Sequence, residues 1–302
     1  MTVVELEARE LSLEQGTGGL WSEAWSRLRR NPGAIAGFVI VAAIAIVAVF
    51  APLIAPHAPT EQNLSLIRAG CCPGPSREHL FGVDELGRDE LSRIIYGARF
   101  SLLIGVVSVT VGFVIGSVLG AVAGFFGGVV DSVIMRIVDV WLTIPGFLMA
   151  VGIVAMLGPG LVQIMIAIGV INVPLFARLL RGAVLAQREN DFVLAARAVG
   201  VPRRSILGSH ILPNAISPVI VQGTLALATA IIDAAGLGFL GLGPQDPSIP
   251  EWGTMLTNTV RFLQTAPHLA IIPGLAIVLT AISINLIGDG LREALDPKLR
   301  SR

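Results

Sequence analysis

Five long stretches without a charged side chain constrain this chain more than any other feature of its sequence. They cover residues 31–60, 100–130, 140–177, 205–232 and 262–288. A helix rises about 1.5 Å per residue, so about 20 apolar residues cross the roughly 30 Å hydrocarbon core of a bilayer. Of the 302 residues, 54% are hydrophobic and only 14% are charged, which is too little charge to cover a soluble domain. The sequence therefore predicts an all-α membrane protein.

The third stretch is too long for one span, and Gly158-Pro159-Gly160 interrupts it. It is expected to form two helices, so the predicted number of transmembrane helices is six. We place them at about 33–55, 101–124, 133–157, 161–181, 214–236 and 269–289. The first is not expected to be a cleaved signal peptide, because its apolar stretch is longer than the hydrophobic region of such a peptide.

The arginine and lysine residues predict the orientation, because cytoplasmic loops carry an excess of basic residues. Most of the 21 basic residues face the cytoplasm when both termini are cytoplasmic. We then expect a cytoplasmic tail with an interfacial helix at 1–32, a periplasmic loop at 56–100 and a cytoplasmic tail at 291–302. Residues 101–290 would form a core of five helices, with a cytoplasmic loop at 188–213.

This cytoplasmic loop is predicted to contain a short amphipathic helix, which Asn190 or Asp191 can cap. Apolar residues follow at positions i, i+3, i+4 and i+7, namely Phe192, Ala195, Ala196 and Val199. Gly200 supplies a left-handed exit, and a second short helix at 203–211 leads to Leu212 and Pro213. A partner groove could cover the apolar stripe; alternatively, the stripe packs under the protein's own helices or lies in the lipid interface.

Small residues predict one helix–helix contact. In lipid, helices associate largely through close backbone approach, which glycine permits. Glycines recur every four residues in the second predicted span, at positions 112, 116, 120 and 124. We expect this ridge to pack against a neighbouring helix.

Polar residues inside the predicted spans are candidates for function, because burying them in lipid is costly. Asp233 and Gln222 are candidates for the translocation path or its gate, although Gln222 could instead join two helices by a hydrogen bond. Arg136 and Asp139, three residues apart, are expected to form an intrahelical ion pair.

No metal site is expected from the cysteines and histidines. Adjacent Cys71 and Cys72 could form a vicinal disulfide, an intermolecular bridge or two free thiols, and two neighbouring thiols without nearby histidines do not make a zinc site. The histidines fall in loops or at span ends, where they are expected to be interfacial: His57, His79, His210 and His268.

The loop at 188–213 resembles the cytoplasmic EAA loop of bacterial ABC importer permeases. That pattern is E-A-A, three residues, G, nine residues and I-x-L-P. Leu194-Ala195-Ala196, Gly200 and Leu212-Pro213 stand at the matching spacing, while Leu194 and His210 depart from the pattern.

Further stretches are similar to the C-type subunit of the dipeptide/oligopeptide permeases. They are HLFGVDELGRD at 79–89, FLGLG at 239–243, EWGTML at 251–256, NLIGDGLR at 285–292 and LDP at 295–297. Together with the loop, these stretches cover nearly the whole chain from about residue 20 in the family's order.

The resemblance implies a type I ABC importer permease in the inner membrane that carries peptides. In that family two related permeases pair, two cytoplasmic ATPases drive them, and an extracytoplasmic binding protein delivers the cargo. The loop would couple to an ATPase through these residues: Asp191, Phe192, Ala195, Ala196, Val199, Gly200, Leu212 and Pro213.

The resemblance further implies that the chain is not an enzyme, binds no cofactor or nucleic acid, and leaves ATP and magnesium to its partners. A nucleotide-binding P-loop needs a lysine within G-x-x-x-x-G-K-[ST], and the only lysine is Lys298 near the C-terminus.

Two other classes fit less well. An intramembrane protease would need a histidine inside a span or a G-x-G-D motif, and the sequence has neither. An ion-coupled secondary transporter would show internal symmetry and more charges within its spans. Within the importer class nickel or another small solute remains an alternative cargo.

Overall fold

The computed structural model describes residues 20–67 and 71–295, and within these ranges it consists of helices and connecting loops. The predicted tails are therefore described only in part, and residues 1–19 and 296–302 lie outside the described chain. Among the described residues, five helices are long and apolar enough to cross a membrane, and six if one bent pair counts as a single span. This confirms the all-α membrane fold.

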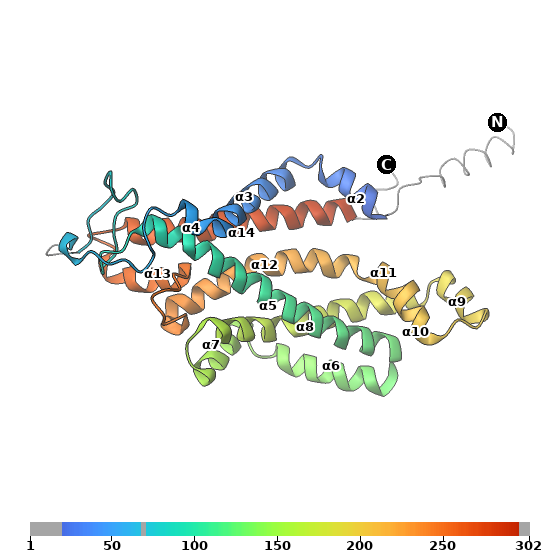
Figure 1. The fold of residues 1–302 in the computed structure, drawn as a ribbon. Coiled ribbons are helices and arrows are strands. Elements are labelled where there is room, and N and C mark those ends of the chain that lie inside the picture. The colour runs from blue at the N-terminus through green and yellow to red at the C-terminus, as the bar shows by residue number, and fades with distance from the viewer. Residues whose placement is uncertain (1–19, 68–70, 296–302) are drawn as a thin grey trace.

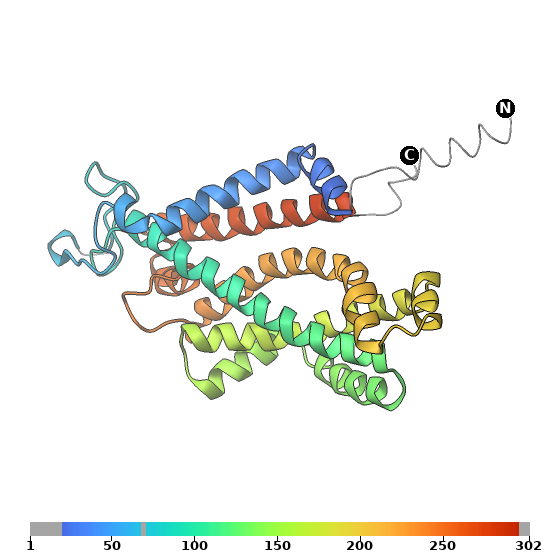
Figure 2. The ribbon, with the colours of Figure 1, turned by 45° about the vertical axis from the view of Figure 1, so that its right-hand side comes forward.

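The first predicted span matches α3, Pro32–Val49, followed by the short α4, Ala51–Ile54. Asn31 caps α3, because its side chain accepts a hydrogen bond from the backbone N–H of Ala34 at 3.0 Å. The predicted interfacial helix is α2, Leu20–Leu28. Figure 2 shows α3 alongside the last helix of the chain.

The second predicted span belongs to a much longer helix, α5 (Glu90–Phe126), which has 37 residues. Asp89 sets its start, since the Asp89 side chain accepts a hydrogen bond from the backbone N–H of Ser92 at 2.8 Å. The last eleven residues of the predicted loop at 56–100 are therefore helical. An α-helix of this length is about 55 Å long, longer than the hydrocarbon core is thick.

The predicted glycine ridge is confirmed as the contact between α5 and α8, Leu161–Arg188. A Cβ atom on Gly112 would lie 2.9 Å from the carbonyl oxygen of Gly169, and one on Gly116 would lie 2.5 Å from that of Val173. A larger side chain at either glycine would push the two helices apart.

The third span was predicted as one helix at about 133–157, and this prediction is wrong because the segment forms two helices. It forms α6, Gly128–Leu142, and α7, Gly146–Leu157, which meet at 86°. Pro145 explains the break, because its ring disfavours the α conformation at the preceding residue and it has no N–H to donate. The predicted break at 158–160 is present, since α7 ends at Gly158 with φ +89°.

The remaining helices complete the bundle. After α8 come α9 (Asp191–Ala198), α10 (Arg203–Ser205), η2 (Ile206–Ile211) and α11 (Leu212–Ala215). The long α12 (Ser217–Leu237) and α14 (His268–Leu295) flank η3 (Gly238–Leu242), α13 (Trp252–Thr259) and η4 (Val260–Phe262). The short η1 (Leu64–Leu66) precedes α5. Figure 1 places α2 and α9–α11 at one end, which we call the α9 end, and α13 with the loop before α5 at the other, the α13 end.

Candidate functional site

The predicted amphipathic helix is α9, between two membrane-spanning helices. Asn190 occupies its N-cap position, although the Asn190 side chain donates to Gln187 Oε1 at 2.8 Å and does not cap the helix. Gly200 has φ +80°, the predicted left-handed exit. The backbone N–H of Val201 donates to the carbonyl oxygen of Ala196 at 3.0 Å and closes the turn.

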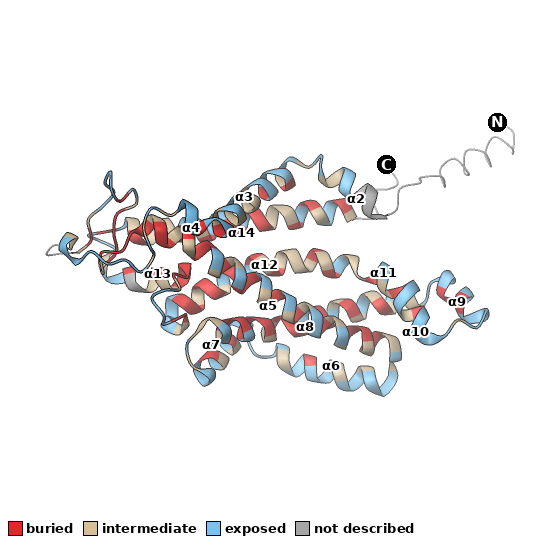
Figure 3. Cartoon of the chain, in the orientation of Figure 1, coloured by how far each residue is buried: buried red, intermediate tan, exposed pale blue. Residues whose placement is uncertain are grey.

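Within the described chain, one of the four residues of the predicted apolar stripe is buried and three are exposed, so the chain's own helices leave most of the stripe uncovered. Ala196 is buried, but its buried neighbour is Val193, which is fully covered. Both lie on the face of α9 that contacts η2. Phe192 and Val199 are 41% and 80% exposed, and Ala195 is exposed as well. An eight-residue helix offers only a narrow face to the short η2, so most residues of α9 are exposed (Figure 3).

Leu194 adds to this outward apolar surface, with 48% of it exposed. Asp191 and Pro213 are exposed as well, and Leu212 is half-buried. Phe192 and Val199 are seven residues apart and share one side of α9, whereas Leu194 lies on a different side. We call Phe192 and Val199 the α9 apolar face.

A basic cavity of about 450 Å³ adjoins α9. Arginines from three elements line it together with apolar side chains, and the lining comprises Phe125, Phe126, Arg188, Arg197, Val201, Arg203 and Ile206. Arg188 Nη1 donates to the carbonyl oxygens of Gly124 and Phe125 at 3.2 Å each. This contact fastens the end of α8 to the end of α5, next to the segment that carries α9.

The expected intrahelical pair between Arg136 and Asp139 is not formed. Asp139 instead accepts a hydrogen bond from Arg178 Nη2 at 2.7 Å, and Asp131 accepts from both Nε and Nη2 of Arg181. The reason is geometric, because α6 lies along α8 and the arginines of α8 reach across to its acids (Figure 1).

The two candidate path residues, Gln222 and Asp233, are half-buried on α12. They are eleven residues apart, close to three helical turns, and so they share one face of the helix. In the described part of the chain neither side chain forms a hydrogen bond or ion pair. The structure thus aligns the two residues without assigning them a role. Two further polar residues within the spans, Asn172 and Thr224, bond to carbonyls of their own helices.

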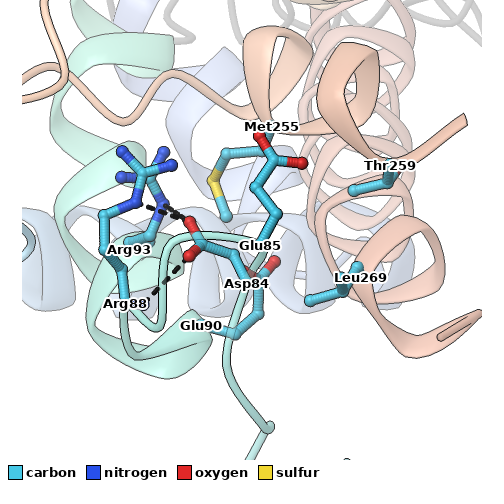
Figure 4. A pocket seen from close by; sticks show the side chains of 8 residues that line it. All are labelled: Asp84, Glu85, Arg88, Glu90, Arg93, Met255, Thr259 and Leu269. Carbon is cyan, nitrogen blue, oxygen red and sulfur yellow. Dashed lines mark hydrogen bonds and ion pairs between the residues drawn. The ribbon is translucent and has the colours of Figure 1, made fainter. Parts of the chain in front are cut away.

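A buried charge network lies at the α13 end, where the sequence suggests only a charged loop. Asp84 Oδ2 accepts from Arg88 Nε at 2.6 Å and lies 3.5 Å from Arg93 Nε (Figure 4). Asp84 Oδ1 accepts from the backbone N–H groups of Leu86 and Arg88, each at 2.9 Å. The cavity among these residues is only about 10 Å³, so it has no room for cargo.

Sequence reasoning missed the burial of these charges. Asp84, Arg88, Glu90 and Arg93 are each less than a tenth exposed. One sequence feature could have indicated this network, namely the i, i+4 spacing of Asp84 and Arg88 around Gly87. Gly87 takes φ +71° in the tight turn between them.

Glu251 fixes the start of α13. Its carboxylate accepts hydrogen bonds from the backbone N–H groups of Gly253 and Thr254 at 2.8 and 2.9 Å. Burial raises the pKa of the Glu251 carboxyl to about 7. The neighbouring Trp252 donates from Nε1 to the carbonyl oxygen of Ile94 at 3.1 Å, which ties α13 to α5.

Comparison with known proteins places this helical bundle in a family. Residues 116–301 match the family described as binding-protein-dependent transport system inner membrane component. Residues 19–70 match the N-terminal TM domain of oligopeptide transport permease C.

Curated relatives match along nearly the whole chain. The dipeptide transport system permease protein DppC of Alkalihalophilus pseudofirmus is 47% identical over 93% of this chain and 91% of its own length. The di/tripeptide transport system permease protein DppC of Pseudomonas aeruginosa is 45% identical over 92% of both chains. The glutathione transport system permease protein GsiD of Shigella flexneri is 46% identical over 93% of this chain and 91% of its own.

The fold itself resembles a solved structure. A chain of the MetNI methionine ABC transporter, in an inward-facing conformation, superimposes with a TM-score of 0.56 at 21% identity, over 68% of this chain and 96% of that chain. The chain therefore belongs to the binding-protein-dependent transport system inner membrane components, and it is a multi-pass permease subunit of an ABC importer in the inner membrane.

Proposed function

We propose that this permease forms half of a pathway that carries short peptides into the cell, and that the α9 apolar face couples it to an ATPase. The relatives are named for dipeptide, di/tripeptide and glutathione transport, which supports peptides as the cargo class over nickel or another small solute. A related second permease completes the pathway, and an extracytoplasmic binding protein delivers the cargo.

The exposure of α9 supports this coupling role. Phe192 and Val199 stay largely exposed on a helix whose other face is buried against η2. Burying one large apolar side chain stabilises a complex by about 1.5–3 kcal/mol, so a groove on an ATPase subunit would gain from covering this face. The arginines of the adjoining cavity give the rim a positive charge, which suits an acidic rim on the partner.

The chain would act without catalysis of its own, with ATP and magnesium held by two cytoplasmic ATPase subunits. Both termini and α9 would then lie in the cytoplasm, and the α13 end would face the binding protein. Closure of the ATPases on ATP would move the two α9 segments together and switch the pathway between inward- and outward-facing states. Gln222 and Asp233, on one face of α12, are the residues we assign to the path.

A charge on the α9 apolar face tests the coupling. Phe192→Asp should reduce recovery of the ATPase subunits with the permease at least about tenfold, since the loss of one buried phenylalanine costs about 1.5–3 kcal/mol. The measurement is quantitative co-purification from detergent of the co-expressed transporter. Thr60→Asp, which adds the same charge at an exposed position of the α13 end, is the control. Equal recovery of the ATPase subunits with Phe192→Asp and with the parent would show that this face is not part of the interface.

A further inference from the structure

Three side chains that are distant in sequence meet at the α13 end. His57 follows α4, His79 lies in the loop before α5, and Asp89 caps α5. One nitrogen or oxygen of each lies within 4.8 Å of those of the other two. His79 Nδ1 is 2.9 Å from Asp89 Oδ1, and His57 Nδ1 is 3.9 Å from Asp89 Oδ2. No spacing or motif in the sequence pairs these residues, and the sequence predicts both histidines as separate interfacial residues.

The group is held in place by the surrounding backbone and by Ser92. The backbone N–H of His57 donates to Ser92 Oγ at 3.0 Å, and Ser92 Oγ donates to Asp89 Oδ2 at 2.7 Å. The backbone N–H of His79 donates to Ser76 Oγ at 3.0 Å. The imidazole nitrogens make none of these contacts, so an ion would replace only the hydrogen bond between His79 Nδ1 and Asp89 Oδ1 while the residues stay positioned.

One of the candidate ligand atoms is unused within the described chain. His57 Nδ1 is buried and has no hydrogen-bond partner there. An unpaired buried polar atom is costly, and buried polar groups usually have a partner. The ring centre of His57 is 4.8 Å from that of His79, the second imidazole. A cation between the two rings and the carboxylate would satisfy His57 Nδ1.

We propose that His57, His79 and Asp89 bind a resident divalent transition-metal ion, with Zn²⁺ as the representative. Two imidazole nitrogens and a carboxylate oxygen are typical ligands of zinc and of other first-row metals, whereas magnesium and calcium prefer oxygen ligands alone. In a tetrahedral site with bonds of about 2.0–2.1 Å, neighbouring ligand atoms are about 3.3 Å apart. The separations of 2.9 and 3.9 Å from Asp89 lie on either side of this value, and the three ligand atoms lie within 4.8 Å of one another. Rotation of the two rings and of the carboxylate would bring them to the spacing of the site.

The ion would join three segments of the chain. It would link the end of the first span, the loop before α5 and the first turn of α5, next to the buried charge network. The fourth position would be open to water on the side of His57, the most exposed of the three with 26% of its side chain accessible. Metal binding at this site does not depend on which cargo the permease carries, so it can be tested independently of the proposed function.

Metal binding to the full chain tests the proposal directly. The chain is purified in detergent, stripped with a chelator and titrated with Zn²⁺ against a chromophoric competitor. We expect one tight equivalent per chain, which a thousandfold excess of Mg²⁺ does not displace. X-ray absorption at the zinc edge should show imidazole ligation at about 2.0–2.1 Å.

Two variants locate the site. Loss of a single outer-shell partner typically lowers metal affinity 10–100-fold, so loss of a direct ligand in His57→Ala should lower it by at least about 100-fold. Asp89→Asn should also weaken binding, and it keeps the cap of α5 because asparagine caps helices as well as aspartate does. His210→Ala in η2, at the other end of the bundle, is the matched control and should bind as the parent does.

Three results would overturn the site. They are no zinc above the detergent blank, full competition by Mg²⁺, and binding by His57→Ala equal to that of the parent. The structure pairs Cys71 and Cys72 in a disulfide. A Cys71→Ser/Cys72→Ser variant excludes this pair as the source of metal binding, because its affinity should match that of the parent. Loss of zinc binding in that variant would show that the cysteines are needed to bind the ion, which would contradict the proposal.

Discussion

The two ends of this bundle differ in what they expose and what they bury. At the α13 end, Asp84, Arg88 and Arg93 are buried and meet one another at hydrogen-bonding distance. At the α9 end, the apolar side chains of Phe192 and Val199 face outward. One end buries charge and the other exposes hydrophobic surface, and each does the opposite of what an isolated domain favours.

The contrast separates a self-contained structure from an incomplete one. Asp84, Arg88 and Arg93 of the α13 end find their partners within the chain, so this network does not depend on another subunit. The α9 apolar face has no cover within the described part of the chain, so the coupling proposed above would bury it against another subunit. Substitutions should therefore act on folding at the first end and on assembly at the second.

The largest effect is expected at the α13 end. Asp84→Ala leaves Arg88 and Arg93 buried without their carboxylate, and breaking a buried pair in this way costs about 3–5 kcal/mol. We expect a strong fall in the melting temperature and yield of the detergent-purified chain, measured by fluorescence-detected size-exclusion chromatography. Asp246→Ala, at an exposed acid of the same end, should change stability by less than about 0.5 kcal/mol. Similar melting of both variants would show that the network adds nothing to folding.

A smaller effect separates the two faces of α9. Val193→Asp places a charge on the buried face and should destabilise the chain by about 3 kcal/mol. Phe192→Asp, one residue earlier on the exposed face, should leave the melting temperature of the isolated chain unchanged. Thermal melting of both variants without partner subunits measures the difference. If both melt alike, α9 does not have one buried and one free face.

The smallest effect concerns pH at the start of α13. The pKa of the Glu251 carboxyl is about 7 in the folded chain against an ordinary 4.5, so the folded state holds this proton more tightly than the unfolded chain does. Its contribution to stability is complete below pH 4.5 and is lost as the pH rises through about 7. Glu251→Gln, which stays neutral at both pH values, should therefore melt close to the parent at pH 5 and be more stable than the parent by about 2–3 kcal/mol at pH 8, because the difference between 4.5 and 7 corresponds to about 3.4 kcal/mol. A parent whose melting does not fall between pH 5 and 8 would contradict this.

Structural features that follow from the positions of glycines along the sequence could be predicted. Glycines four residues apart predict the contact between α5 and α8, because any larger residue would collide with the backbone of α8. Gly200 predicts the end of α9, and Gly158 that of α7, because both require positive φ. In each case the local backbone requirement decides the structure.

Features set by distant contacts were not predictable in the same way. Whether Val193 or Phe192 is buried depends on where η2 lies, and hydrophobicity cannot decide between two apolar residues. Asp139 is three residues from Arg136 in sequence, yet it pairs with Arg178 because α8 runs beside α6. The break at Pro145 was visible in the sequence, but a single proline within an apolar helix often only bends it.

The length of α5 connects the two ends physically. One uninterrupted rod starts at the capping carboxylate of Asp89, runs along α8 through the glycine ridge, and stops where Arg188 binds its last carbonyls. A continuous helix resists compression along its axis, so an axial displacement of one end is expected to move the other end as well. The permease thus contains a mechanical link from one membrane surface to the opposite one within a single secondary-structure element.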